Sequence, residues 1–278
     1  MTISSCVFIK SGCKINLGLQ IVEKRPDGYH NINSVFLPVM WQDIIELIVI
    51  PEQNKPIVLK TSGIKIDTDP QFNTIYKLLT LLKQNYAIPP LYVHLHKCIP
   101  MGAGLGGGSA NAAEVLKYLK NHFLSTLTDT EALILLSKIG SDCVFFWNTE
   151  PAIIRGTGSQ CHTFSISLKG YFLVLIYPHL NISTAWAYSQ CVPKPAEIDI
   201  ADILSKPLNT WKDVLHNDFE APVFKAYPLL DQIKQNLYKK GAVYASMSGS
   251  GSTMYGIFNE IPDLSEFAMY SCFTQTLQ

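Results

Sequence analysis

The sequence predicts an α+β protein of two domains, and three observations support this prediction. Its 278 residues exceed one small module and fall short of three ordinary domains of about 100–150 residues. Hydrophobic residues make up 47% of the chain and charged residues 16%, which suits a full core and excludes disorder. Hairpin-like strands and helices follow one another without regular alternation, which favours α+β over doubly wound α/β. Glycines near residue 158 break the pattern, so we expect domains of residues 1–160 and 161–278.

Alternating side chains predict the first strand. Apolar residues occupy every second position of residues 14–21, and polar residues or glycine stand between them, which is the period of a half-buried strand. Pro26-Asp27-Gly28 then predicts a turn. Further predicted strands cover residues 33–39, 43–50, 92–97, 171–177, 242–247 and 253–258.

Helices are predicted where apolar residues recur at helical spacing. Residues 74–86 form one such segment. Thr128 and Glu131 have the form of a capping box that opens another helix, which ends near Gly140. Further helices are expected after the glycine-rich segment at 102–108 and around Trp186, Val214 and Ile233.

Charge and cysteine usage exclude several classes of protein. Lysine plus arginine number 22 and aspartate plus glutamate number 22, so the formal net charge is zero. Binders of duplex DNA or of membrane surfaces need a basic excess, so we expect neither nucleic acid nor a membrane as partner. The 7 cysteines are scattered without a Cys-x-x-Cys pair, which disfavours a disulfide framework or a zinc site. Without a secretory or transit signal, we expect a cytoplasmic protein, a monomer or weak homodimer, that binds small molecules.

The most informative segment is a glycine-rich loop between a predicted strand and a predicted helix. Residues 100–111 read PMGAGLGGGSAN. Each glycine costs backbone entropy, so helix propensity would not select such a composition. Bare N–H groups at a helix start can hold a phosphate, which is the use that we infer. A flexible connector is the simpler interpretation, but a strand-to-helix connection needs only about two to six residues.

Other phosphate-binding loops fit this segment less well. Gly102, Gly104 and Gly107 satisfy G-x-G-x-x-G, which is a weak signal. A Rossmann site would need an acidic residue after a second strand about 20 positions on, where the predicted helix still continues to His122. A Walker loop would need lysine in place of Gly108, and the H-R-D and D-F-G segments of protein kinases do not occur.

The loop resembles the phosphate-binding motif of the GHMP kinases, a family that includes galactokinase, homoserine kinase and mevalonate kinase. The segments KINLGL at 14–19, RPDGYH at 25–30 and GSDCVFF at 140–146 resemble one branch of that family. MSGSGS at 247–252 resembles its third glycine motif. The resemblance covers the whole chain in the same order. Asp-Gly-Tyr-His is specific to the branch, whereas the glycine loop alone indicates only the family.

The resemblance implies both a fold and a reaction. The fold has an N-terminal domain like the second domain of ribosomal protein S5 and a ferredoxin-like C-terminal domain. The reaction is phosphorylation of the 2-hydroxyl of cytidyl-diphospho-methylerythritol, a step of the non-mevalonate isoprenoid pathway. ATP is the implied phosphoryl donor, and Mg²⁺ is the implied cofactor.

The resemblance assigns the chemical step to two residues. Asp142 is the implied general base for the attacking hydroxyl, although an aspartate after a helix end is often only a cap. Cys143-Val144 follows it where the family usually has Val-Pro. Lys14 shares a strand face with Asn16, an implied substrate contact, and its charge would keep the Asp142 carboxyl ionised and offset charge that grows during transfer. A solvated strand lysine is the alternative.

The resemblance also implies an aromatic clamp for the cytidine end of the substrate. Tyr29 is expected against the base, His30 as a hydrogen-bonding partner, and Tyr188 as the second platform, with Thr184 near the substrate. The family often has phenylalanine and flanking prolines at that platform, and this chain has neither, so Trp186 is a neighbouring candidate. Simple packing is the alternative for Tyr29 and His30.

The remaining implied contacts concern the nucleotide and the diphosphate. Asn73 matches an asparagine near the adenine, although Phe72 precedes it where aspartate is usual. Ser109 is the expected Mg²⁺ or phosphate ligand, and Ser248 and Gly249 are expected to support the phosphates. The full set of expected nucleotide contacts is Pro100, Met101, Gly102, Ala103, Gly104, Leu105, Gly106, Gly107, Gly108, Ser109, Asn73 and Lys97, of which Lys97 could instead be a solvated residue at a strand end.

Two other functions remain open from the sequence. A GHMP kinase of the homoserine or mevalonate type would lack the Asp-Gly-Tyr-His segment and would have no use for a paired aromatic clamp. A non-catalytic ligand sensor on the same fold should have lost catalytic positions, yet Lys14 and Asp142 are both present.

Overall fold

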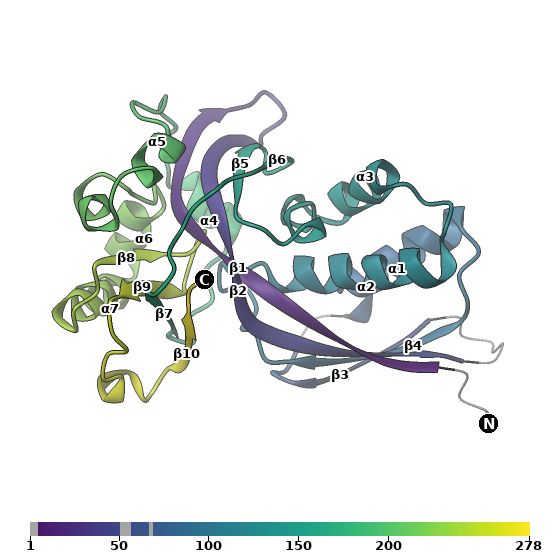
Figure 1. The fold of residues 1–278 in the computed structure, drawn as a ribbon. Helices are drawn as coiled ribbons and strands as arrows, with labels where there is room; N and C mark the ends of the chain where they lie inside the picture. The colour runs from purple at the N-terminus through teal and green to yellow at the C-terminus, as the bar shows by residue number, and fades with distance from the viewer. Residues whose placement is uncertain (1–4, 51–56, 67–68) are drawn as a thin grey trace. The chain divides into compact units, whose positions relative to one another are not determined.

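The first two strands of the chain form one long hairpin (Figure 1). The computed structural model describes residues 5–50, 57–66 and 69–278, and β1 (Ser5–Lys24) and β2 (His30–Val49) run for 20 residues each. The strands predicted for residues 14–21, 33–39 and 43–50 are therefore parts of two longer ones. The predicted turn joins them: Arg25 N donates to Tyr29 O (2.8 Å) and Gly28 N donates to Arg25 O (3.1 Å).

The described residues gather in two compact units. Unit 1 contains the described part of residues 1–13, 40–100 and 106–149, and unit 2 contains residues 14–39, 101–105 and 150–278. Both β1 and β2 contribute to each unit, so neither unit is a continuous stretch of chain. The expected domain boundary near residue 160 stays a prediction.

The other elements follow in chain order. The remaining strands are β3 (Ile57–Gly63), β4 (Leu91–Lys97), β5 (Ala152–Gly156), β6 (Gln160–Thr163), β7 (Phe172–Tyr177), β8 (Tyr244–Met247), β9 (Met254–Phe258) and β10 (Ser271–Thr276). The α-helices are α1 (Thr74–Asn85), α2 (Gly107–Phe123), α3 (Asp129–Ile139), α4 (Thr184–Ser189), α5 (Ile200–Leu204), α6 (Glu220–Ala226) and α7 (Pro228–Lys239). Short 3₁₀ turns are η1 (Pro70–Phe72), η2 (Ser141–Cys143), η3 (Phe145–Trp147), η4 (Leu208–Asp213) and η5 (Ser265–Phe267).

Unit 1 packs helices against a mixed sheet. The C-terminal half of β2 pairs antiparallel with β4, and β3 pairs parallel with β4. Figure 1 shows α1 and α2 side by side over these strands, and α3 packs against both helices. The predicted capping box at the start of α3 is confirmed, because Thr128 Oγ1 accepts from Glu131 N (3.2 Å) and Thr128 N donates to Glu131 Oε2 (2.8 Å).

Unit 2 contains a second, antiparallel sheet. The N-terminal half of β2 pairs with β5, which pairs with β6, while the second sheet has the strand order β10-β7-β9-β8. Helix α7 packs on β8 and β9, and its buried Leu230, Ile233 and Leu237 join one core with Val174 and Ile176 of β7. The predicted strands over residues 171–177, 242–247 and 253–258 are thus confirmed as β7, β8 and β9.

Two local predictions are wrong, and tertiary contacts explain both. No helix surrounds Val214, because η4 ends at Asp213 and the following backbone runs beside β1, where Leu19 N donates to His216 O (2.9 Å). Residues 14–17 of β1 are not half-buried, since Lys14 is only 3% exposed and Asn16 only 1%. Chain from elsewhere in unit 2 covers the polar face of β1: Tyr255 Oη, for example, donates to Asn16 O (2.7 Å). None of the described helices is long and apolar enough to cross a membrane.

A buried carboxylate organises the polar interior of unit 1. Asp43 of β2 is fully buried, and its Oδ1 accepts from Cys98 N (2.8 Å) and Ile99 N (2.9 Å). Its Oδ2 accepts from Lys97 Nζ (2.5 Å) and from Asn111 Nδ2 (3.0 Å). Asp43 therefore ties the end of β4, where the chain enters the glycine loop, to the first turns of α2.

We predict that Asp43→Asn lowers the free energy of unfolding by about 3–5 kcal/mol, because it leaves the buried Lys97 ammonium without its counter-charge. Urea denaturation followed by circular dichroism measures this loss. Lys120→Gln is the control, since it breaks only the exposed ion pair with Asp129 (3.1 Å) and should cost far less. Equal losses of unfolding free energy in the two variants would contradict the conclusion that Asp43 organises the polar interior of unit 1.

Candidate active site

The glycine loop ends at the start of a long helix that has no side-chain cap. Gly106 is the N-cap residue of α2, with φ of 68°, a left-handed conformation that favours glycine. Gly106 has no side chain, so the N-cap residue makes no side-chain hydrogen bond to the first N–H groups of α2. Since the first turn of any helix also lacks intrahelical partners for these groups, they are available to an anion. The start of α2 therefore has the backbone groups that an anion such as phosphate needs.

Gly104 lies where two loops of unit 2 approach backbone to backbone. Its φ is 77°, and a Cβ built on it would stand 1.9 Å from Ser248 O. Ser248 Oγ donates to Gly104 O (2.9 Å), and Thr253 N donates to Ala103 O (3.2 Å). Any side chain at position 104 would push these loops apart, so the glycine is required here by packing as well as by conformation.

The ammonium group of Lys14 reaches the same carbonyl oxygen. Lys14 Nζ donates to Gly104 O (3.1 Å) and to Asn16 Oδ1 (2.7 Å), and it lies 4.3 Å from the centre of the Phe36 ring. Asn16 Nδ2 in turn donates to Ser34 Oγ (2.9 Å). Lys14 and Asn16 thus share a strand face, as the alternation predicts, but this face is buried and the lysine is not a solvated surface residue.

Unit 1 brings Ser109 to the turn that carries Asp142. Ser109 lies in the first turn of α2, and Asp142 lies in η2 immediately after α3. The Ser109 side chain hydrogen-bonds the Cys143 thiol, whose pKa is raised to about 11, mainly by burial. A hydroxyl from α2 thus reaches the short turn that carries the Asp142 carboxylate, although the two residues are far apart in the sequence.

The expected adenine-side residues have structural partners of their own. Asn73 caps α1, with its Oδ1 accepting from Ile75 N (2.9 Å), and the next residue, Thr74, donates from Oγ1 to Gly108 O (2.5 Å). This bond ties the start of α1 to the glycine loop. Lys97 is buried and donates to Asp43, so its amine is used inside unit 1 in this structure. Its assignment to the nucleotide stays a prediction.

The aromatic pair that forms in unit 2 is His30 with Tyr188. Their ring centres are 4.8 Å apart with an interplanar angle of 15°, and Phe219 packs edge-on against Tyr188 (4.9 Å, 82°). Tyr29 is instead 65% exposed at the hairpin turn. Burial, with a smaller effect of Lys24, lowers the pKa of His30, so its imidazole is neutral near pH 7. The ring stacked on Tyr188 is therefore an uncharged group with one donor and one acceptor.

The contacts of Trp186 and Tyr188 distinguish these two candidates for the second aromatic platform. Trp186 packs edge-on against Tyr227 (5.7 Å, 88°), so Tyr188, and not Trp186, lies beside the turn of the hairpin. Thr184 Oγ1 hydrogen-bonds Ser250 Oγ (3.0 Å), which joins the platform helix α4 to the loop at 248–252.

The structure also places residues near these loops that the sequence did not single out. Asn181 lies against Gly102, because a Cβ added to that glycine would stand 2.5 Å from Asn181 Oδ1. Asn217 donates to the loop at 248–252 through Gly249 O (2.8 Å). Single asparagines in loops carry no periodic or spacing signal, so only the folded chain reveals them.

Comparisons with known proteins give this arrangement a family. Residues 73–148 match the model of the GHMP kinases N terminal domain, and residues 200–266 match that of the GHMP kinases C terminal. The chain is 42% identical over 267 residues to a 4-diphosphocytidyl-2-C-methyl-D-erythritol kinase of Bacteroides fragilis, covering 95% of this chain and 97% of that protein. It is 44% identical over 245 residues to the protein of the same name in Bacteroides thetaiotaomicron, covering 88% and 89%.

Solved structures agree with this result. The crystal structure of a 4-(cytidine 5'-diphospho)-2C-methyl-D-erythritol kinase superposes with a TM-score of 0.81 and 26% identity, covering 98% of this chain and 99% of that one. The mevalonate kinase of Methanococcus jannaschii shares the fold, with a TM-score of 0.72 at 15% identity over 99% of each chain.

The chain belongs to the GHMP kinases, enzymes that use ATP as phosphoryl donor. Within that class it belongs to the family of the 4-diphosphocytidyl-2-C-methyl-D-erythritol kinases. The expected α+β, two-domain GHMP kinase fold is confirmed.

We predict that Gly104→Ala abolishes most kinase turnover, with a loss of at least about 100-fold, because the added methyl group displaces Ser248 and with it the loop geometry. Steady-state kinetics measures the loss of turnover, and urea denaturation measures any accompanying loss of stability. Gly170→Ala is the matched control, since Gly170 also has a positive φ (91°) but an added Cβ meets nothing within 4 Å. It should cost only the left-handed backbone energy of about 1–2 kcal/mol. Normal turnover in Gly104→Ala would contradict the packing argument.

Proposed function

We propose that the protein transfers the γ-phosphoryl group of ATP to the 2-hydroxyl of 4-(cytidine 5'-diphospho)-2-C-methyl-D-erythritol, in the non-mevalonate pathway to isoprenoid precursors. The observation that carries the choice of substrate is the stacked His30–Tyr188 pair on a GHMP kinase fold. A mevalonate or homoserine substrate has no base to stack. The high identity to relatives of this one name supports the same choice.

The nucleotide is held mainly by backbone groups. The uncapped start of α2 offers N–H groups and the positive end of a helix dipole to the phosphates. Asn73, at the start of α1, and Lys97, at the end of β4, are the proposed contacts beyond the loop. Since α1 is bonded to Gly108, movement of the loop would also move Asn73.

The residues present fit a magnesium ion that arrives with the nucleotide. Mg²⁺ usually keeps several waters and takes one or two carboxylates plus substrate phosphates. Ser109 and Asp142 offer one hydroxyl and one carboxylate around the same turn, and the described residues contain no group of three or more His, Cys, Asp or Glu that could cage a metal. When bound, the ion would neutralise charge on the transferring phosphate oxygens.

Asp142 and Lys14 are the proposed catalytic residues. The Asp142 carboxylate accepts or orients the proton of the attacking 2-hydroxyl. The Lys14 ammonium is held by Gly104 O and Asn16 Oδ1, so it is oriented before the reaction and stabilises charge that develops on the phosphoryl group. Burial strengthens this effect, because a charge acts more strongly where water is excluded.

The cytidine end is read by stacking and by hydrogen bonds. Stacking contributes about 1–3 kcal/mol per base and tolerates any base, so it supplies affinity. Selectivity comes from a polar edge, and the neutral His30 offers a donor and an acceptor next to Tyr188. Tyr29, exposed at the adjacent turn, is free to cover the other side of the base. The other proposed substrate contacts are Asn16, Thr184, Ser248 and Gly249. The cytoplasmic location and the monomeric or weakly dimeric state stay predictions.

Asp142→Asn keeps the shape of the side chain and removes its charge. We predict that kcat falls by about 10²–10⁴-fold while ATP affinity changes little, the scale of a positioned acid–base group. Coupled kinase assays and nucleotide titration measure the two quantities. Glu150→Gln, an exposed carboxylate just after η3, is the control and should keep normal kcat. Turnover near normal in Asp142→Asn would reduce Asp142 to a structural cap.

Tyr188→Ala should weaken the cytidyl substrate specifically. We predict a rise in its KM of about 10- to 100-fold, which follows from the stacking energy, with KM for ATP unchanged. Trp186→Phe, two residues away on α4, is the control, because Trp186 packs on Tyr227 instead of on His30. The clamp is refuted if Tyr188→Ala raises both KM values equally or neither of them.

A further inference from the structure

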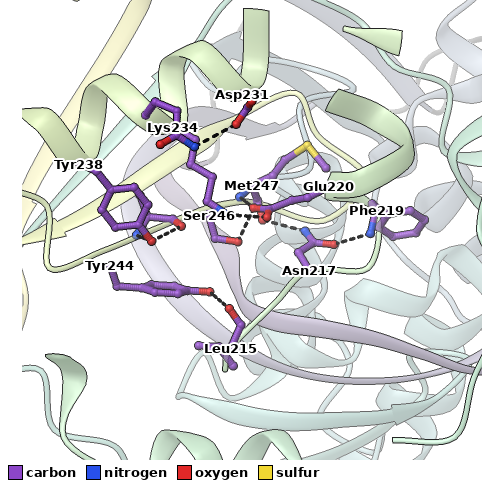
Figure 2. A network of polar contacts seen from close by, with 12 residues as sticks. Leu215, Asn217, Phe219, Glu220, Asp231, Lys234, Tyr238, Tyr244, Ser246 and Met247 are labelled. Carbon is purple, nitrogen blue, oxygen red and sulfur yellow. Dashed lines mark hydrogen bonds and ion pairs between the residues drawn. The ribbon is translucent and has the colours of Figure 1, made fainter. Parts of the chain in front are cut away.

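Asn217 lies at the centre of a buried polar network of unit 2 (Figure 2). It is 3% exposed and precedes α6, and all of its side-chain hydrogen-bonding groups are engaged. Its Nδ2 donates to Met247 O (2.8 Å) and to Gly249 O (2.8 Å), and its Oδ1 accepts from Phe219 N (3.0 Å). The amide therefore holds both sides of Ser248, at the point where β8 becomes the third glycine loop.

Glu220 secures the strand immediately before that loop. Its Oε1 accepts from Ser246 Oγ (2.8 Å) and from Met247 N (2.8 Å), and Lys234 of α7 neutralises the carboxylate. Figure 2 shows Glu220 and Asn217 approaching the end of β8 together. The end of β8 thus cannot shift without breaking several buried hydrogen bonds.

The same segment is joined to β1, the strand that carries Lys14. Leu19 N donates to His216 O (2.9 Å) and Asp218 N donates to Leu19 O (2.9 Å). The Asp218 side chain also accepts from Ile21 N (2.7 Å). Residues 216–218 therefore connect β1 on one side to the glycine loop at 248–252 on the other.

The loop that Asn217 holds ends at the groups proposed for catalysis. Ser248 Oγ and Lys14 Nζ both donate to Gly104 O, at 2.9 and 3.1 Å. If Ser248 moves, Gly104 O loses one donor and a backbone neighbour, so this acceptor of the Lys14 ammonium is held less firmly in place. Reacting groups misplaced by about 1 Å can cost about 100-fold in rate.

We propose that Asn217 is a positioning residue for phosphoryl transfer, which holds the turn at Met247–Gly249 so that Ser248 fixes Gly104 O and, through it, Lys14. This inference rests on the proposed roles of the glycine loop and of Lys14. The side-chain groups of Asn217 are engaged by Met247 O, Gly249 O and Phe219 N, so in this proposal it contributes through the loop. Its loss should therefore lower kcat more than it raises either KM.

Asn217→Asp tests the proposal. The variant keeps the side-chain shape and the acceptor for Phe219 N, but it turns an oxygen towards two carbonyl groups in place of two donors. Tyr238→Phe is the matched control: Tyr238 Oη also makes two hydrogen bonds to β8, to Ala245 O and from Ala245 N (both 3.2 Å), and it does not contact the loop. Melting temperature, kcat and the KM of each substrate are measured for both variants.

We expect kcat of Asn217→Asp to fall by about 100-fold with each KM within about tenfold, while Tyr238→Phe keeps kcat within about threefold at a comparable melting temperature. Adding Ser248→Ala should cause little further loss in Asn217→Asp, because both changes act on the same contact to Gly104. The proposal is overturned if Asn217→Asp keeps kcat within threefold, if Tyr238→Phe loses as much, or if the double variant loses the product of the single effects.

Two further measurements keep these outcomes distinct. If Asn217→Asp does not fold, Asn217→Ser removes the same two donors without adding a charge, and the same limits on kcat apply. Asp142→Asn and the unmodified enzyme are assayed in parallel, the first as the test of the proposed catalytic residue and the second as the test of the proposed function. An inactive Asp142→Asn beside a fully active Asn217 variant refutes only the positioning role. An active Asp142→Asn refutes only the catalytic role of Asp142, whereas an unmodified enzyme that does not phosphorylate the cytidyl substrate refutes the proposed function itself.

Discussion

The carbonyl oxygen of Gly104 is the acceptor on which the unit 2 part of the site depends. Lys14 Nζ and Ser248 Oγ both donate to it, and the close approach of Ser248 O leaves no room for a Cβ. Two glycine-rich segments, 144 residues apart in sequence, thus meet at one peptide group. In this contact the Lys14 ammonium is oriented by the Gly104 carbonyl oxygen and by Asn16 Oδ1, and electrostatic stabilisation of a transferring phosphoryl group requires a group that is oriented in advance.

Two buried lysines illustrate how the same side chain serves different purposes. Lys97 in unit 1 forms an ion pair with the fully buried Asp43, which also accepts backbone N–H groups at the end of β4. This pair supports the entry to the glycine loop. Lys14 in unit 2 donates to the oxygens of Gly104 and Asn16. A charge held in this way is oriented, which suits the catalytic role proposed for Lys14, whereas the Lys97 ammonium is paired with Asp43 in this structure.

The aromatic residues of unit 2 are likewise held in place by packing. Tyr188 is braced by Phe219 at its edge and covered by His30 on its face, and burial keeps the imidazole neutral by lowering its pKa. A neutral ring can both donate and accept, which a cation cannot, so its edge can distinguish one base from another. Tyr29 lies at an exposed turn, where it can adapt to a ligand at low cost.

The sequence by itself determined the class of the protein and the identity of most candidate residues. Strand and helix periods are local, and the glycine loop, the Asp-Gly-Tyr-His turn and the segment around Asp142 are contiguous, so they can be read from neighbours along the chain. The merging of the short strands into one hairpin, the burial of Lys14 and the partner of Tyr188 were decided by the tertiary structure. Asn217 shows the reason most clearly. Its importance comes from hydrogen bonds to residues 30 and 32 positions away, and no local pattern encodes contacts that exist only when β8, β1 and the glycine loops are folded together.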